Sequence, residues 1–231
     1  MTTIQENLSK SIYAWISDKS VFVSGRVNRY DGQMVECDGF PATIGSLCEI
    51  DTETEVPAIA EVIGFHAGQN LLSLHDFGAL ISVGAKVKVI DDGYQIPVGE
   101  GLLGRVTDAL GAPLDEMPMP SLTDKWPLLG KELNPLAKNP VDKPLDVGVR
   151  AINSLLSVGR GQRIGIIAGS GVGKSILLGM MSKYTEADIV VVGMIGERGR
   201  EVGSFVNTIF SEDSKNRTAV VAVPADRSPL L

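Results

Sequence analysis

Hydrophobic and polar positions alternate in short runs over residues 21–90. Alternation with a period of two is typical of strands that bury one face. Turn-forming pairs such as Asp31-Gly32, Asp38-Gly39 and Asp92-Gly93 separate the runs. The pattern predicts six short strands, at residues 21–29, 34–37, 46–50, 58–65, 71–74 and 86–90. Short strands in this number indicate a small closed β-barrel, because closure leaves no exposed strand edges.

A different pattern begins at residue 146, where apolar runs alternate with helical stripes. The runs predict strands at residues 162–168, 188–195 and 218–224, and the stripes predict helices at 149–156, 174–184 and 201–210. Strands that alternate with helices favour a parallel sheet with helical crossovers. The run at 188–195 is almost continuously apolar, which predicts a strand buried on both faces.

The stretch between these two regions shows neither the alternation of a strand nor the apolar stripe of a helix. Residues 96–146 contain prolines at positions 113, 118, 120, 127, 135, 140 and 144. A proline removes a backbone donor and clashes with the preceding helical turn, so a long helix is excluded here. We expect a connector that wraps over the surface.

Composition narrows the class of protein. The 231 residues are 44% hydrophobic and 21% charged, which is typical of a globular protein. The net charge of -7 disfavours a nucleic-acid partner, because such binding relies on neutralising phosphates. Two cysteines and two histidines are too few for a disulfide scaffold or a zinc site built from them.

The first residues carry an apolar stripe without the features of a secretory signal. Ile4, Leu8, Ile12 and Ile16 recur every fourth residue beside Trp15, which predicts an amphipathic helix. This helix either packs on its own domain or docks on a partner or a membrane surface. No apolar run is long enough to span a bilayer, so we expect a cytoplasmic protein.

The strongest chemical motif lies between the predicted strand at 162–168 and the predicted helix at 174–184. It reads Ala168-Gly169-Ser170-Gly171-Val172-Gly173-Lys174-Ser175. In this context the glycines let backbone N–H groups converge on phosphate oxygens, and the helix N-terminus adds positive charge. Lys174 would reach the β- and γ-phosphates of ATP, and the Ser175 hydroxyl would coordinate Mg²⁺. The alternative is a glycine-rich turn with a chance lysine.

A second charged motif follows the predicted strand at 188–195. It reads Gly196-Glu197-Arg198-Gly199-Arg200-Glu201-Val202, at the carboxyl end of a parallel strand, where ligands bind in open α/β sheets. Hydrolysis of a phosphoanhydride needs a group that orients water and a cation that holds the developing charge. Glu197 suits the first role and Arg198 the second. A solvated loop that caps the next helix explains the pattern equally well.

Together these motifs resemble the catalytic core of the rotary ATP synthase superfamily, and more closely the flagellar and type III secretion export ATPases. The resemblance is carried by residues 102–106, 108, 144–153, 158–163, 168–175, 196–202 and 224–231. It covers nearly the whole chain and is specific from residue 96 onward. The run at 145–153 leans toward the flagellar branch.

The resemblance implies a domain order and a set of roles. It implies a docking helix at 1–19, a β-barrel assembly domain at 20–92 and an incomplete RecA-like ATP-binding domain at 93–231. The implied fold class is therefore a small N-terminal β-barrel followed by a partial RecA-like P-loop parallel-sheet domain. Lys174 and Ser175 would bind phosphate and Mg²⁺, Glu197 would activate water, and Arg198 would sense the γ-phosphate.

The resemblance also implies partners. Intact family members form hexameric rings that hydrolyse ATP and energise protein export. Their N-terminal helix docks a regulatory, stator-like export protein and associates with the inner membrane, near the export gate and its protein substrates. An injectisome ATPase and a hexameric nucleic-acid translocase are the alternatives. A translocase would carry a basic barrel, however, and residues 21–90 contain no dense basic patch.

Family members continue well past Leu231. This sequence therefore lacks the strand with the magnesium-orienting aspartate, the arginine supplied to a neighbouring site, the adenine-contacting residues and the helical C-terminal domain. We expect a fragment that is a weak or inactive ATPase by itself, or that serves as a non-hydrolysing assembly module.

Overall fold

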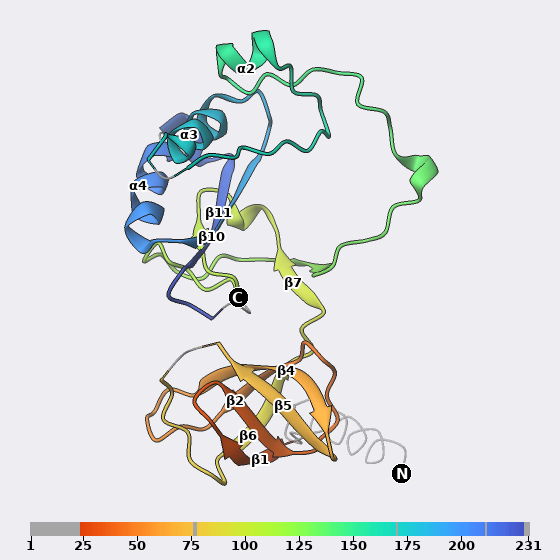
Figure 1. Cartoon of the computed structure of the whole chain (residues 1–231), viewed down its shortest axis with the longest axis vertical. Coiled ribbons are helices and arrows are strands. Elements are labelled where there is room, and N and C mark those ends of the chain that lie inside the picture. Colours follow the sequence, from red (N-terminus) through yellow and green to blue (C-terminus); the bar gives the residue numbers. More distant parts are fainter. Residues whose placement is uncertain (1–23, 76–77, 170, 211, 229–231) are drawn as a thin grey trace, which may run out of the picture. The chain divides into compact units, whose positions relative to one another are not determined.

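The structure is a computed structural model that describes residues 24–75, 78–169, 171–210 and 212–228. The helix predicted at residues 4–16 and Ser170 of the phosphate loop lie outside these residues. The chain divides into two units between Tyr94 and Gln95. Each unit is considered by itself below (Figure 1).

The first unit is an antiparallel barrel, as the alternating pattern predicts. In the described part of the chain, six strands close in the order β1-β2-β5-β4-β3-β6 (Figure 1). The strands are β1 (Ser24–Tyr30), β2 (Met34–Asp38), β3 (Leu47–Ile50), β4 (Ala58–His66), β5 (Gln69–Leu74) and β6 (Lys86–Asp91). All six predicted strands are therefore present, with ends shifted by a few residues.

The barrel core is built from the inward-facing positions of that alternation. Its buried side chains are mostly small or β-branched, as a narrow barrel requires: Val27, Val35, Cys37, Cys48, Ile50, Ala58, Ala60, Val62 and Val87, together with Phe40, Leu72 and Leu74. Burial raises the pKa of both cysteine thiols, Cys37 and Cys48, to about 12. The two thiols are therefore unreactive packing groups.

The second unit contains a parallel sheet and its helices. The sheet order is β10-β11-β8, and a separate ribbon pairs β7 with β9. The strands are β7 (Gln95–Val98), β8 (Val106–Thr107), β9 (Asp124–Pro127), β10 (Val190–Glu197) and β11 (Thr218–Pro224). The helices are η1 (Glu100–Leu102), η2 (Pro135–Ala137), α2 (Arg150–Leu155), α3 (Lys174–Tyr184), α4 (Gly199–Ile209) and α5 (Glu212–Lys215).

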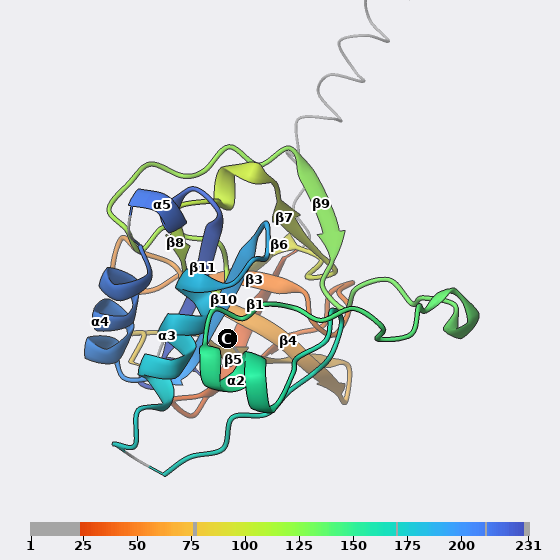
Figure 2. The ribbon, with the colours of Figure 1, turned by 90° about the horizontal axis from the view of Figure 1, so that it is seen from above.

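One face of this sheet is covered by α4, with α3 beside it (Figure 2). Phe205 and Ile209 of α4 pack against Met194 of β10 and Val220 and Ala222 of β11. These apolar residues of α4 are four positions apart, so they share one face of the helix. Burial of this face is what attaches α4 to the sheet.

The strand predicted at residues 162–168 is not formed. No described strand lies alongside this segment, so its N–H and C=O groups lack the partners that hold a parallel strand. Ile167 is 99% exposed. The prediction of a strand at 162–168 was therefore wrong for this chain, because the described residues supply no neighbouring strand for this apolar run.

The prediction that the strand at 188–195 is buried on both faces was also wrong. Met194 of β10 is buried beneath α4, whereas Val191 and Ile195 on the opposite face are 72% and 62% exposed. β10 is also one of the two edge strands of its sheet among the described residues. β11 takes the central position instead, and most of its residues are buried.

The predicted connector contributes more structure than its prolines indicate. Val106 and Thr107 form β8 of the parallel sheet, paired with Val220 and Val221. The adjacent Arg105 donates two hydrogen bonds to Asp115, at 2.7 and 2.9 Å, and a third to the carbonyl oxygen of Pro118. Asp115 also accepts from the Val106 and Met117 N–H groups. This clasp holds the proline-rich loop against the sheet edge.

The clasp predicts an acid-dependent stability. Its hydrogen bonds from Arg105 hold the pKa of Asp115 far below the ordinary value of 3.8. A carboxyl whose pKa is lowered by folding stabilises the folded state above its unfolded pKa, and this contribution is lost as pH falls. Asp115→Asn is therefore expected to lower the urea midpoint at pH 6 and to flatten its decline below about pH 4.

The exposed Asp142 provides the matched control. Urea midpoints followed by circular dichroism between pH 2 and 6 compare Asp115→Asn with Asp142→Asn. Identical pH profiles for the two variants would contradict the role of the clasp.

Candidate nucleotide-binding site

The described part of the predicted phosphate loop lies open at the start of α3. Gly173 is the N-cap of this helix with φ +96°, a left-handed conformation that glycine adopts without strain. A Cβ placed on Gly169, Gly171 or Gly173 would meet no atom within 4 Å. The loop is therefore solvated, and its N–H groups are accessible to an anion.

The side chains that follow the loop begin the helix. Lys174 and Ser175 are the first two residues of α3, and Val172 before them is exposed. Lys174 and Ser175 stand at the positive end of the helix macrodipole, which favours bound phosphate.

The structure brings Lys174 and Glu197 together from separate elements. Glu197 is the last residue of β10, and Lys174 Nζ donates to its Oε1 at 3.4 Å. The two side chains are 41% and 33% exposed, so solvent weakens this ion pair. An incoming anion therefore competes readily for Lys174.

A β-bulge directs Glu197, and the sequence pattern did not predict this bulge. Ile195 pairs with Val223 and Glu197 pairs with Pro224, which leaves Gly196 as an extra residue in β10. Gly196 has φ +73°, a conformation that favours glycine. Bulges next to functional sites redirect a side chain. The Gly-Glu pair at the end of an apolar strand was the only feature of the sequence that pointed to it.

Arg198 does not join this pair. It is the N-cap residue of α4, it is exposed, and its side chain makes no hydrogen bond or ion pair with the described residues. Its carbonyl oxygen accepts from the Glu201 and Val202 N–H groups and so begins the helix. The position fits the capping interpretation and also leaves the guanidinium free to meet an anion, so its role stays a prediction.

The donor set fits a magnesium ion that is carried in with phosphate. Among the described residues no cluster of three histidine, cysteine or acidic side chains is present to cage a metal. Mg²⁺ commonly takes one or two protein oxygens and completes its shell with phosphate oxygens and water. The exposed Ser175 hydroxyl at the start of α3 is suited to that single contact.

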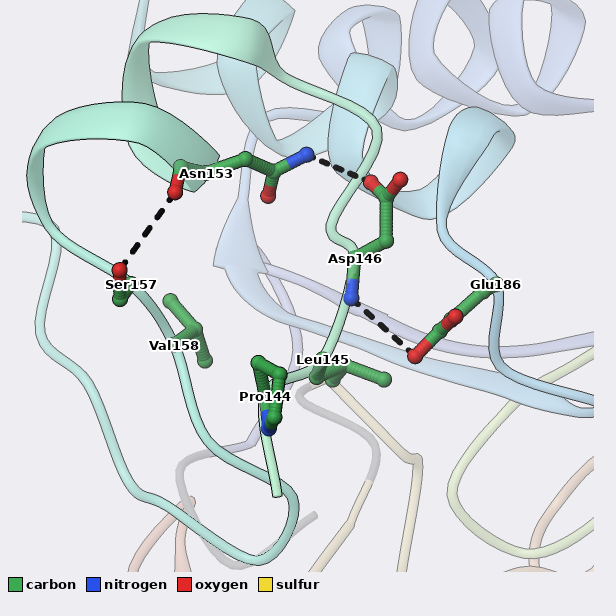
Figure 3. Close-up of a pocket in the computed structure, with 7 residues that line it drawn as sticks. All are labelled: Pro144, Leu145, Asp146, Asn153, Ser157, Val158 and Glu186. Carbon is green, nitrogen blue, oxygen red and sulfur yellow. Dashed lines mark hydrogen bonds between the residues drawn. The ribbon is translucent and has the colours of Figure 1, made fainter. Parts of the chain in front are cut away.

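A pocket of about 230 Å³ lies away from the phosphate loop, beside the turn that follows α3 (Figure 3). Asp146 accepts from Asn153 Nδ2 and from the Gly148 N–H, both at 2.6 Å, and its own N–H donates to Glu186. The hydrogen bond from Gly148, followed by that from Asn153, lowers the pKa of Asp146. The polar groups that line this pocket are therefore hydrogen-bonded to one another, and these bonds connect α2 to the turn after α3.

Comparison with known proteins defines the class. Residues 148–231 match the nucleotide-binding domain of the ATP synthase alpha/beta family. This segment contains the phosphate loop, the Lys174–Glu197 pair and the parallel strands β10 and β11. The segment is therefore similar to a nucleotide-binding domain of that family.

The similar proteins include both flagellar and type III secretion proteins. The chain is 46% identical to the flagellum-specific ATP synthase of Pseudomonas aeruginosa, over 90% of this chain and 47% of that protein. It is 41% identical to the Bacillus subtilis protein of the same name, over 90% of this chain and 48% of that protein. It also superimposes with a TM-score of 0.78 and 35% identity on the assembled ATPase EscN of the enteropathogenic E. coli type III secretion system, covering 89% of this chain and 49% of EscN.

The chain spans about half the length of these relatives. Within that span the resemblance to the flagellar and type III secretion export ATPases is confirmed. The predicted fold class, a small barrel followed by part of a RecA-like parallel-sheet domain, is also confirmed.

The bulge leads to a prediction about Gly196. Gly196→Ala is expected to cost about 1–2 kcal/mol of unfolding free energy, because an alanine is strained at positive φ. Gly193→Ala, in the same strand, is the control, since its φ is ordinary and its nearest neighbour lies 4.0 Å from the new Cβ. Urea denaturation measures both, and equal costs would show that the bulge imposes no constraint.

Proposed function

We propose that this chain carries the ATP-binding part of an ATPase that energises flagellar protein export. The observation that supports it most directly is the 3.4 Å approach of Lys174, from a phosphate loop, to Glu197, at the end of a parallel strand. The branch rests on identity, which is 46% to a flagellum-specific ATP synthase and 38% to a type III secretion ATPase of Xanthomonas euvesicatoria. The injectisome alternative is therefore the weaker one.

The proposed chemistry assigns one task to each residue. The N–H groups of residues 169–173 and the Lys174 ammonium hold the β- and γ-phosphates, and Ser175 holds Mg²⁺. Mg²⁺ supplies charge neutralisation on the phosphate oxygens. Phosphate competes with Glu197 for Lys174, which frees the carboxylate to orient the attacking water and accept its proton. Arg198 stabilises the charge that develops on the γ-phosphate.

The proposed assembly is a ring of six subunits in which the barrel of β1–β6 mediates contacts between copies. EscN has been solved both as an assembled ATPase and in complex with its central stalk EscO. We propose that the segment at 1–19 docks a regulatory, stator-like export protein, and that the ring works at the inner membrane beside the export gate and its protein substrates. Among the described residues, no helix is both long and apolar enough to cross a bilayer.

We also propose that this length of chain hydrolyses ATP weakly when alone. Its relatives are about twice as long. In this chain the outer edge of β10 is unpaired among the described residues, and Ile195 close to Glu197 is largely exposed. An exposed site supports little charge stabilisation, because water screens the groups that act on the phosphate.

The first test concerns binding. Lys174→Ala is expected to weaken binding of Mg²⁺–ATP by the 231-residue chain about tenfold or more, because the phosphate loses its charged donor. Lys183→Ala, in the last turn of the same helix, is expected to bind as the unsubstituted chain does. Titration calorimetry compares the three proteins. Equal affinities would overturn the phosphate-binding assignment.

The second test concerns hydrolysis and uses protein extended to the full length of the relatives, in which turnover is measurable. Glu197→Gln is expected to lower the rate about 10²–10⁴-fold, because the amide does not accept a proton from water. ATP affinity is expected to change little. Glu201→Gln, in the first turn of α4, is the control. Persistent hydrolysis in Glu197→Gln would exclude Glu197 as the water-activating residue.

A further inference from the structure

The Lys174–Glu197 contact depends on how α3 is directed past β10. The two elements follow each other in the chain and run in opposite senses, so the start of α3 meets the end of β10. The other end of α3 meets the start of β10 through a short turn at residues 185–189. Contacts that hold the turn at 185–189 fix the end of α3, and they therefore influence the position of Lys174 at its start.

Arg217 holds the turn from the neighbouring strand. It directly precedes β11, and its guanidinium donates to the carbonyl oxygens of Lys183 and Thr185, each at 3.0 Å, and to that of Ala187. These carbonyls belong to the end of α3 and the turn after it, where helix geometry leaves carbonyl groups without partners. A cation at this position also interacts favourably with the helix macrodipole.

The backbone of the same residue connects the clamp to the sheet. The carbonyl oxygen of Arg217 accepts from the Val190 N–H at 2.8 Å, which begins the parallel pairing of β10 with β11. One residue thus ties together the end of α3, the start of β10 and the start of β11.

A second contact holds α3 at its middle. Gly179 packs against α4, where a Cβ on this glycine would lie 3.7–3.9 Å from Phe205, Thr208 and Ile209. Two fixed points determine the direction of a rigid helix. Lys174 lies roughly 16 Å from the clamp at 1.5 Å per residue, so a tilt of about 10° displaces it by about 3 Å. That displacement is as large as the separation of Lys174 and Glu197.

We propose that Arg217 is a positioning residue for nucleotide binding, because it clamps the end of α3 and so holds Lys174 where it meets phosphate. The inference rests on the proposed function, since it concerns the same site. Arg217 itself lies at the opposite end of α3 from the phosphate loop.

The experiment measures Mg²⁺–ATP affinity and amide hydrogen exchange in the 231-residue chain. Arg217→Ala is expected to weaken ATP binding about tenfold, the equivalent of one charge-assisted hydrogen bond lost at Lys174. Exchange is expected to rise across α3 and to stay unchanged in the barrel. Arg217→Lys, which keeps a cation and part of the hydrogen bonding, is expected to give an intermediate affinity, and it replaces the alanine variant should that fail to fold.

The control is Arg160→Ala. Arg160 reaches the same turn but pairs with the Glu186 carboxylate at 3.0 Å and contacts none of the helix carbonyls. It is expected to leave ATP affinity unchanged. If a general loss of stability were the cause, the ATP affinity of each variant would instead fall in step with its urea midpoint.

A double substitution separates positioning from a structural role. In a Lys174→Ala background, Arg217→Ala is expected to change ATP affinity less than about twofold, because its effect passes through Lys174. A full-size effect in that background, or wild-type affinity in Arg217→Ala, would overturn the inference. If the unsubstituted chain does not bind ATP, both the proposed function and this inference are overturned. If the unsubstituted chain and Arg217→Ala bind ATP equally well and only Lys174→Ala loses affinity, the inference alone is overturned.

Discussion

The site depends on the parallel pairing of β10 with β11. That pairing buries Met194, Val220 and Ala222 under α4 and fixes the carboxyl end of β10. Because α3 leads into β10 through a short turn, the start of α3 is returned to that same end. A lysine and a glutamate that lie 23 positions apart in the sequence are therefore 3.4 Å apart in space. Phosphate loop, helix start and strand end form one site only because the crossover is held in this way.

The same arrangement explains why the site is exposed. β10 has a strand on one side only among the described residues, and its face opposite α4 carries the exposed Val191 and Ile195. Residues 162–168, which lead into the phosphate loop, run without a strand partner. Relatives about twice as long match this chain over about half of their length. The chain therefore presents the groups proposed to bind phosphate in a solvated form, in which charges act more weakly than in an enclosed site.

The barrel contrasts with this open sheet because it is complete in itself. Each of its strands has two partners, and its inward-facing apolar side chains form one core. Local pattern and tertiary structure agree there, so the sequence predicted every strand. At residues 162–168 the local pattern predicted a strand just as clearly, but the tertiary structure contains none there. A strand is not a local structure, and its stability requires a neighbour that the pattern does not reveal.

Local chemistry in the sequence was enough to predict the start of α3 at Lys174, the bounds of β11 and the six strands of the barrel, because helix caps and hydrophobic periods act over a few residues. It also brought out Lys174, Ser175 and Glu197 as candidates. Only the tertiary structure showed that a bulge at Gly196 directs Glu197, that Arg105 and Asp115 clasp the proline-rich loop, and that Arg217 holds the end of α3. These three features arise from contacts between residues distant in the chain, or from strand register, and neither leaves a periodic trace in the sequence.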